Sequence, residues 1–220
     1  MIRAVLFDLD GTLYDRDALV QALVDEQHAA FEVALAGISR EHFVSRVLEM
    51  DDHGFGNKED GYARIVDEWG FRPDLAAQLV AYFWANYDKF CELSADTATT
   101  LQTLRDCGKR LGVVTNGSTD RQRKKLAALG LLTSFDAILI SESEGTRKPS
   151  PEIFHRALRQ CGVEAGEAVF VGDNPEVDIE GARNAGLLPI WKHVPYWSLR
   201  TDNVPTVHTL NEILPICLGR

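Results

Sequence analysis

Short apolar runs that recur along the chain, each ending in polar residues, constrain the fold of this sequence more than any other feature. The clear runs are residues 4–7, 111–114, 137–140 and 168–171, with a weaker run at 188–191. Because each run is nearly all apolar, we expect a strand that is buried on both faces. Helical apolar spacing separates the runs, at residues 98–107, 121–129, 152–161 and 177–185. This alternation predicts an α/β fold, with a doubly wound parallel sheet covered by helices on both faces.

One long segment breaks the alternation. It contains four helix-like stretches and no strand pattern, at roughly residues 17–36, 40–50, 58–69 and 73–89. We therefore expect an all-helical cap domain, residues 15–90, inserted into an α/β core made of residues 1–14 and 91–220. A chain of 220 residues is long enough for one such core and one accessory unit.

Composition excludes several classes of protein. The 45% hydrophobic and 25% charged residues are typical of a soluble globular protein, and no apolar run approaches the roughly 20 residues that span a bilayer. The N-terminal residues lack a signal-peptide pattern, so we expect a cytoplasmic protein. The four cysteines are scattered without a CxxC pair, which argues against a disulfide framework and a structural zinc site. A net charge of −10 disfavours a nucleic-acid polymer as partner. We expect a monomer or a small homo-oligomer.

Polar residues follow four of the predicted strands. In open parallel sheets, ligands bind outside the carboxyl ends of the strands, so these residues form the candidate site. In chain order they are Asp8 and Asp10, then Thr115, Asn116 and Gly117, then Lys148, and finally Asp173 with Asp178 five residues beyond it. Carboxylates, an amine, a hydroxyl and glycine-rich backbone thus converge at one edge of the predicted sheet.

The carboxylates in this set predict a metal site. Asp8 and Asp10 are two residues apart and would share a face of an extended strand. Two carboxylates that close repel each other unless a cation lies between them or one is protonated. Asp173 would supply a third carboxylate from another strand, and oxygen ligands of this kind select Mg²⁺.

The remaining residues predict an anion site. Thr115 and Asn116 carry side-chain donors, and Gly117 allows close backbone approach where a helix begins, a place that presents free N–H groups to an anion. The ammonium of Lys148 would balance the charge of a phosphoryl group. Each motif alone is common in ordinary turns and connections. Their joint occurrence, each at the same end of its own strand, indicates a phosphoryl-transfer site.

The four motifs resemble those of the haloacid dehalogenase superfamily. They are Asp8-Leu9-Asp10-Gly11-Thr12, Thr115-Asn116-Gly117, Lys148-Pro149, and Gly172-Asp173 with Asp178. The resemblance implies that Asp8 attacks phosphorus, and that Asp10 protonates the leaving group and then activates water. It also implies that Asp8, the backbone carbonyl of Asp10 and Asp173 hold Mg²⁺. Thr115 and Lys148 would bind the phosphoryl group, and Asp178 would support the metal shell.

Asp10 favours one branch of that family. The dehalogenases that displace halide from carbon resemble this core but lack the second aspartate. The presence of Asp10 therefore favours a phosphatase. We therefore expect a Mg²⁺-dependent phosphomonoesterase that acts on a small phosphorylated metabolite through an aspartyl-phosphate intermediate, with nucleotidases among the candidates. A phosphomutase of the same fold is an alternative, and so is a catalytically weak phosphate-binding regulatory module. The intact pair Asp8 and Asp10 favours an enzyme over the module.

The cap is expected to select the substrate, because the core groups contact only phosphate. A loop rich in glycine and charge, residues 51–58, interrupts the helical segment. Loops carry specificity in many enzymes, and His53 and Lys58 could reach a polar group of the substrate. These two residues are the candidate specificity determinants.

Overall fold

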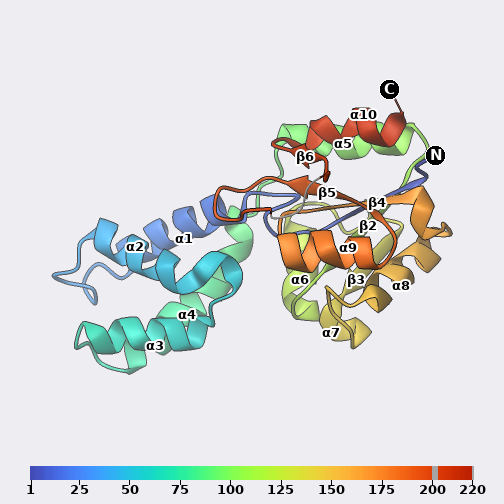
Figure 1. Cartoon of the computed structure of the whole chain (residues 1–220). Coiled ribbons are helices and arrows are strands. Elements are labelled where there is room, and N and C mark those ends of the chain that lie inside the picture. Colours follow the sequence, from blue (N-terminus) through green and yellow to red (C-terminus); the bar gives the residue numbers. More distant parts are fainter. Residues whose placement is uncertain (200–202, 220) are drawn as a thin grey trace. The chain divides into compact units, whose positions relative to one another are not determined.

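The chain is organised in two compact units. The computed structural model describes residues 1–199 and 203–219. One unit comprises Met1–Asp15 and Glu92–Arg220, and the other comprises Arg16–Cys91. Figure 1 labels the helices and strands of both units and colours them along the sequence.

The first unit is built on a six-stranded parallel sheet with the order β3-β2-β1-β4-β5-β6. Its strands are β1 (Ala4–Phe7), β2 (Arg110–Thr115), β3 (Ala137–Ile140), β4 (Ala168–Gly172), β5 (Leu188–Lys192) and β6 (Thr206–Val207). The predicted α/β fold is confirmed, and all five predicted strands are present. The strand β6 was missed because two residues are too short for any apolar pattern.

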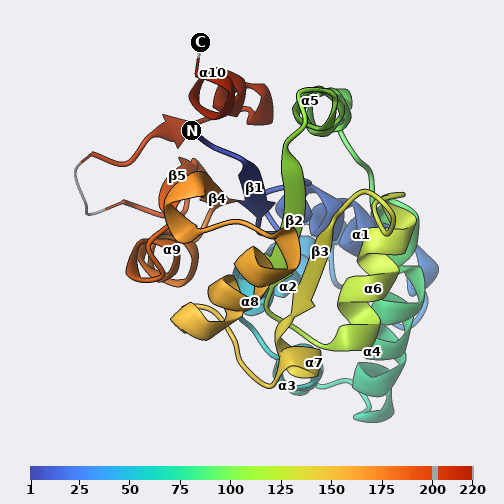
Figure 2. The same ribbon diagram turned by 90° about the vertical axis from the view of Figure 1, so that its right-hand side faces the viewer.

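Helices cover both faces of this sheet. They are α5 (Ala95–Asp106), α6 (Thr119–Ala128), α7 (Ser141–Glu144), α8 (Pro151–Cys161), α9 (Gly181–Asn184) and α10 (Ile213–Leu218), with the 3₁₀ turns η3 (Ala165–Glu167) and η5 (Leu210–Glu212). In Figure 2, α5 and α10 lie side by side on one side of the strands, and α8 and α9 lie on the other. Phe154 of α8 packs edge-on against Phe170 of β4, with ring centroids 5.0 Å apart, inside the core that α8 and α9 share with the sheet.

The helix expected at residues 177–185 is interrupted. It begins as a π-helical segment, η4 (Pro175–Glu180), before α9 continues it. The Asn174 side chain caps its start by accepting hydrogen bonds from the N–H groups of Glu176 and Val177, at 3.0 and 2.9 Å. Single π-helical turns are rare and occur often at functional sites, and η4 carries Asp178.

The second unit is helical, as the sequence predicted. Its helices are α1 (Arg16–Ala30), α2 (Arg40–Asp51), α3 (Lys58–Glu68) and α4 (Asp74–Asn86), with the 3₁₀ turns η1 (Asp52–Gly54) and η2 (Tyr87–Phe90). Helix α1 ends at Ala30, six residues before the expected end at residue 36. Of residues 31–37 only Leu35 is buried, so little packing stabilises this stretch as a continuation of the helix.

Candidate active site

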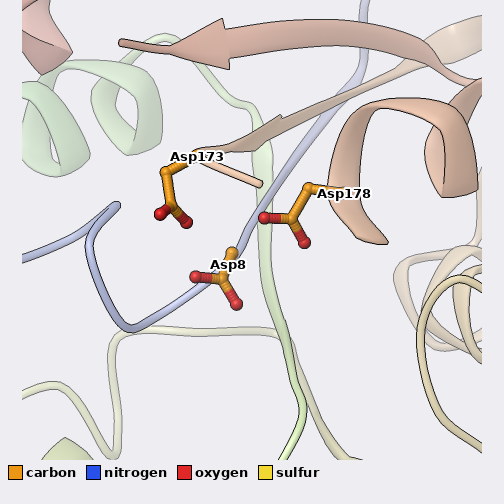
Figure 3. Close-up of side chains that lie close together, drawn as sticks. All are labelled: Asp8, Asp173 and Asp178. Carbon is orange, nitrogen blue, oxygen red and sulfur yellow. The ribbon is translucent and has the colours of Figure 1, made fainter. Parts of the chain in front are cut away.

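Three carboxylates lie together at the carboxyl end of the sheet. Asp8 directly follows β1, Asp173 directly follows β4, and Asp178 lies in η4. Figure 3 shows the three side chains turned toward one another, and one oxygen of each lies within 4.8 Å of the others. All three residues are buried. Strands far apart in the sequence therefore assemble a compact, desolvated group of oxygen atoms.

Lys148 lies within this carboxylate cluster. Its ammonium donates to Asp8 Oδ1 at 2.5 Å and to Asp178 Oδ1 at 2.7 Å, and the residue is 2% exposed. Burial by itself disfavours the charged ammonium, but Asp178 and Asp8 outweigh it, so the pKa of Lys148 is raised above its ordinary value. The lysine is fixed in place because α8 begins three residues later with Pro151 at its first position.

The charge of this group fits a divalent cation. Burial raises the pKa of Asp8 to about 7, and the nearby Asp178 and Asp10 add to that increase. Burial, together with Asp8 and Asp178, raises the pKa of Asp173 to about 9. Unit charges 4.8 Å apart repel by about 3.5 kcal/mol at an effective dielectric constant of about 20. With all carboxylates ionised and Lys148 protonated, the formal charge is −2, which one Mg²⁺ would neutralise through the oxygen ligands it prefers.

The residues after β2 make a connection that the sequence did not reveal. The side-chain amide of Asn116 donates to the backbone carbonyl of Lys148 and accepts from the Lys148 N–H, both at 3.0 Å. The Gly117 N–H donates to Ser141 Oγ at 3.0 Å. Asn116 thus braces the backbone of Lys148 with its side chain. Binding of a phosphoryl group by Thr115, Asn116, Gly117 and Lys148 stays a prediction.

The carboxylate of Asp10 is held apart from the other three. Gln122 Nε2 donates to Asp10 Oδ2 at 2.8 Å, Lys125 Nζ donates to Oδ1 at 2.6 Å, and the Tyr14 hydroxyl also donates to Oδ1. The group that Asp10 was expected to offer a metal is its backbone carbonyl, and that role stays a prediction. Asp178, expected to support the metal shell, lies within 4.8 Å of the other two carboxylates.

Sequence reasoning missed Gln122 and Lys125. Both lie on α6, three residues apart, and therefore on the same face of that helix. Their one signal in the sequence is that α6 directly follows the Thr115-Asn116-Gly117 motif. Since lysine and glutamine on a short helix ordinarily face solvent, that signal is weak.

The two cap residues differ in their surroundings within the helical unit. The ammonium of Lys58 is paired with Asp51 in a buried cluster, where Arg16 also donates to Asp51 at 2.6 and 2.8 Å. His53 has a left-handed backbone, its side chain is 38% exposed, and its Nδ1 lies 2.5 Å from Asp17 Oδ2. The specificity role of both residues stays a prediction. Lys58 has the geometry of a buried ion pair, whereas His53 presents part of its ring to solvent.

Comparison with known proteins gives a consistent result. The sequence profile of the haloacid dehalogenase-like hydrolase family matches residues 2–186. The chain is 36% identical to a glyceraldehyde 3-phosphate phosphatase of Methanopyrus kandleri over 86% of its own length and 83% of the relative. It is 37% identical to a phosphoserine phosphatase of Thermus thermophilus over 61% and 53% of the two chains. A haloacid dehalogenase-type hydrolase of Bacillus subtilis bound to magnesium shares its fold, with a TM-score of 0.77 at 23% identity over 98% of each chain.

Within the described residues, no helix has the length and apolarity to span a membrane.

Proposed function

The chain belongs to the haloacid dehalogenase-like hydrolases and is a phosphatase of that family, and on this premise we propose that Asp8 is its nucleophile. The substrate is the monoester of a small phosphorylated metabolite. The observation that carries the proposal is the buried group of Asp8, Asp173 and Asp178 with Lys148 between two of them. A regulatory module that merely binds phosphate has no chemical need for this arrangement next to a second aspartate.

Mg²⁺ is the cofactor of this chemistry, and Asp8 and Asp173 are the residues that would hold it, together with the backbone carbonyl of Asp10. When bound, it would supply positive charge that reduces the repulsion between the carboxylate nucleophile and the phosphoryl oxygens. Burial and neighbouring carboxylates raise the pKa values of Asp8 and Asp173, and a bound Mg²⁺ would favour the ionised form of both groups.

In the first half of the reaction, a carboxylate oxygen of Asp8 forms a bond to phosphorus. The bond between phosphorus and the ester oxygen breaks, and its electron pair goes to that oxygen, which takes a proton from Asp10. Lys148 contacts Asp8 and carries the positive charge that orients the phosphoryl oxygens. Thr115 lies at the end of β2 and donates its hydroxyl proton to one of them.

In the second half, Asp10 takes a proton from water, and the hydroxide oxygen bonds to phosphorus. The bond between phosphorus and Asp8 breaks, which releases inorganic phosphate and restores both aspartates. A phosphomutase would return the phosphoryl group to a second hydroxyl of the substrate. Release of inorganic phosphate therefore distinguishes the two reactions.

The substrate class is a short, polar, singly phosphorylated molecule. Both relatives named above act, by name, on three-carbon phosphate esters. Neither name refers to a nucleotide, so the nucleotidase expectation gains no support. His53, with its partly exposed ring, is the cap residue we propose to contact the leaving group.

The test is release of inorganic phosphate from a panel of glyceraldehyde 3-phosphate, phosphoserine, glycerol 3-phosphate and a nucleoside monophosphate, with Mg²⁺ and with excess chelator. We expect turnover of the short esters when Mg²⁺ is present and no turnover in excess chelator. Asp8→Asn should lower kcat by at least about 10³-fold, because an amide is a poor nucleophile. Asp106→Asn, on the surface of α5, is the matched control and should retain activity. Full activity in chelator, or in Asp8→Asn, would refute the proposal.

A further inference from the structure

Two side chains of α6 hold the carboxylate of Asp10. Gln122 Nε2 donates to one oxygen at 2.8 Å, and Lys125 Nζ donates to the other at 2.6 Å. All three residues belong to the same compact unit of the chain. Neither Gln122 nor Lys125 is part of the four motifs at the strand ends, and the mechanism above gives them no role.

Gln122 and Lys125 are much less exposed to solvent than the neighbouring lysine of the same helix. Gln122 and Lys125 are 2% and 8% exposed, whereas the side chain of Lys124 is 60% exposed and pairs with Asp120 one turn earlier. A buried lysine or glutamine destabilises a fold unless its polar atoms are paired. Adjacent lysines of one helix thus have different surroundings, and the inward one is paired with Asp10.

Gln122 also connects Asp10 to Thr115. Its Nε2 donates to Thr115 Oγ1 at 2.6 Å in addition to Asp10, so both hydrogens of the amide nitrogen are used. The Thr115 hydroxyl accepts this bond, which leaves its own proton for another acceptor such as a phosphoryl oxygen. Gly117 makes room for the arrangement, because a Cβ at that position would lie 3.1 Å from Cγ and Cδ of Gln122.

We propose that Gln122 and Lys125 are positioning residues for the reaction, an inference that rests on the proposed function. They fix the carboxylate of Asp10 where it meets the ester oxygen, and Gln122 also directs the hydroxyl of Thr115 toward the phosphoryl group. Asp10 lies beyond the end of β1, so the sheet ladder does not restrain its side chain. Productive proton transfer requires hydrogen-bond reach, and a displacement of about 1 Å can cost about 10²-fold in rate.

This role predicts dependence on the leaving group. An alkyl phosphate needs a proton on its departing oxygen, whereas p-nitrophenyl phosphate releases a stable phenolate without one. The alkyl-to-aryl ratio is the kcat/KM value for the alkyl ester divided by that for the aryl ester. It reports the step in which Asp8 attacks, and hence the contribution of Asp10 as an acid. Loss of Lys125 should lower this ratio, whereas a purely structural defect would lower both kcat/KM values by the same factor and leave the ratio unchanged.

The experiment compares Lys125→Met, Gln122→Leu and the control Lys124→Met, using p-nitrophenyl phosphate and the best alkyl phosphate of the panel. Lys125→Met should lower kcat/KM for the alkyl ester by about 10²-fold, mainly through kcat, with a much smaller loss for the aryl ester. Lys125→Arg, which retains a cationic donor, should recover part of the ratio. Lys124→Met should leave both esters unchanged.

Gln122→Leu provides an independent readout through Thr115. It should lower the alkyl-to-aryl ratio and also weaken inhibition by inorganic phosphate, which Lys125→Met should not do. Thermal melting identifies a variant that fails to fold, and Gln122→Asn, which retains the amide on a shorter side chain, then replaces Gln122→Leu. An unchanged or raised ratio in folded Lys125 and Gln122 variants would overturn the inference. Absence of phosphate release by the wild-type protein would instead refute the proposed function.

Discussion

Gly172 leaves the space that Asp178 occupies. A Cβ built at this last residue of β4 would lie 2.4 Å from the Cβ and 2.5 Å from the Cγ of Asp178, closer than such atoms approach in proteins. The backbone of Asp173 is fixed nearby, because the Trp191 indole donates to its carbonyl at 2.7 Å. The absence of a side chain at residue 172 therefore sets the position of a carboxylate six residues later.

Gly172→Ala should displace Asp178 and disturb the pairing of Lys148 while the sheet remains. We expect a loss of phosphatase activity larger than the loss of stability, which for overpacking is typically about 1–3 kcal/mol. The measurements are kcat/KM and urea unfolding. Gly166→Ala is the matched control, since a Cβ there would meet no atom within 4 Å. Equal activity of the two variants would show that Asp178 tolerates the shift.

A buried ion cluster joins three helices of the cap. Asp51 at the end of α2 accepts from Arg16 of α1 and Lys58 of α3. Burial raises the pKa of the Asp51 carboxyl, but the bonds and charges of Arg16 and Lys58 outweigh it, so that pKa lies below its ordinary value. Burial lowers the pKa of Lys58, which Asp51 counteracts only in part. The cluster fixes the start of α1 against the loop that carries His53.

Asp51→Asn should destabilise the cap by about 3–5 kcal/mol, because two buried cations lose their anion. The control Asp74→Asn removes an exposed partner of Arg72 and should cost about 0–1 kcal/mol. The folded pKa of Asp51 is depressed, so its stabilising contribution is present above the unfolded pKa of about 3.9 and disappears as pH falls through the folded pKa. Urea unfolding at neutral and acid pH checks both statements. A difference from wild type that does not shrink at acid pH would contradict them.

The loop after α2 has a second testable property. We expect His53→Ala to change the relative kcat/KM values of the phosphate esters by about 10–200-fold, because contacts to the leaving group discriminate by roughly 1–3 kcal/mol. Lys58→Ala should act mainly on stability, since its ammonium is buried against Asp51. The measurement is the substrate panel for each variant. A uniform loss for all esters in His53→Ala would exclude a role in specificity.

The carboxylate cluster depends on contacts between residues that are far apart in the sequence. The carboxylates of Asp8, Asp173 and Asp178 come together only when β1 and β4 pair side by side, and Lys148 joins them from the segment before α8. Burial and neighbouring carboxylates raise the pKa values of Asp8 and Asp173, so ionising them in the folded state costs free energy that a bound cation would offset. Binding of Mg²⁺ would therefore stabilise the fold.

Mg²⁺ should raise the melting temperature of the protein. A ligand at 100 times its Kd adds about 2.7 kcal/mol, which corresponds to roughly 5–10 °C for a chain of this size. Potassium chloride of equal ionic strength should have little effect, and Asp173→Asn should lose the Mg²⁺ response. Differential scanning fluorimetry measures all three. A Mg²⁺ shift that survives in Asp173→Asn would assign the metal to other ligands.

The class of fold and the main catalytic candidates follow from the pattern of residue types along the chain. Apolar runs that alternate with helical spacing indicate a parallel sheet, because strands that are apolar on both faces must be covered by helices on both faces. Polar residues directly after those runs must then lie at one edge, so Asp8 and Asp173 could be identified from their positions in the sequence, and Lys148 from the loop that follows the third run. These are consequences of local pattern and strand direction.

The tertiary structure alone decided which side chains touch. Sequence spacing shows that Gln122 and Lys125 share a face of α6, but only packing turns that face inward to meet Asp10. The brace from Asn116 to Lys148 spans 32 residues and Lys58 faces Asp51 instead of solvent, and neither follows from residue type. Burial decides these cases, because a polar group removed from water must find a partner, and that partner is set by the fold.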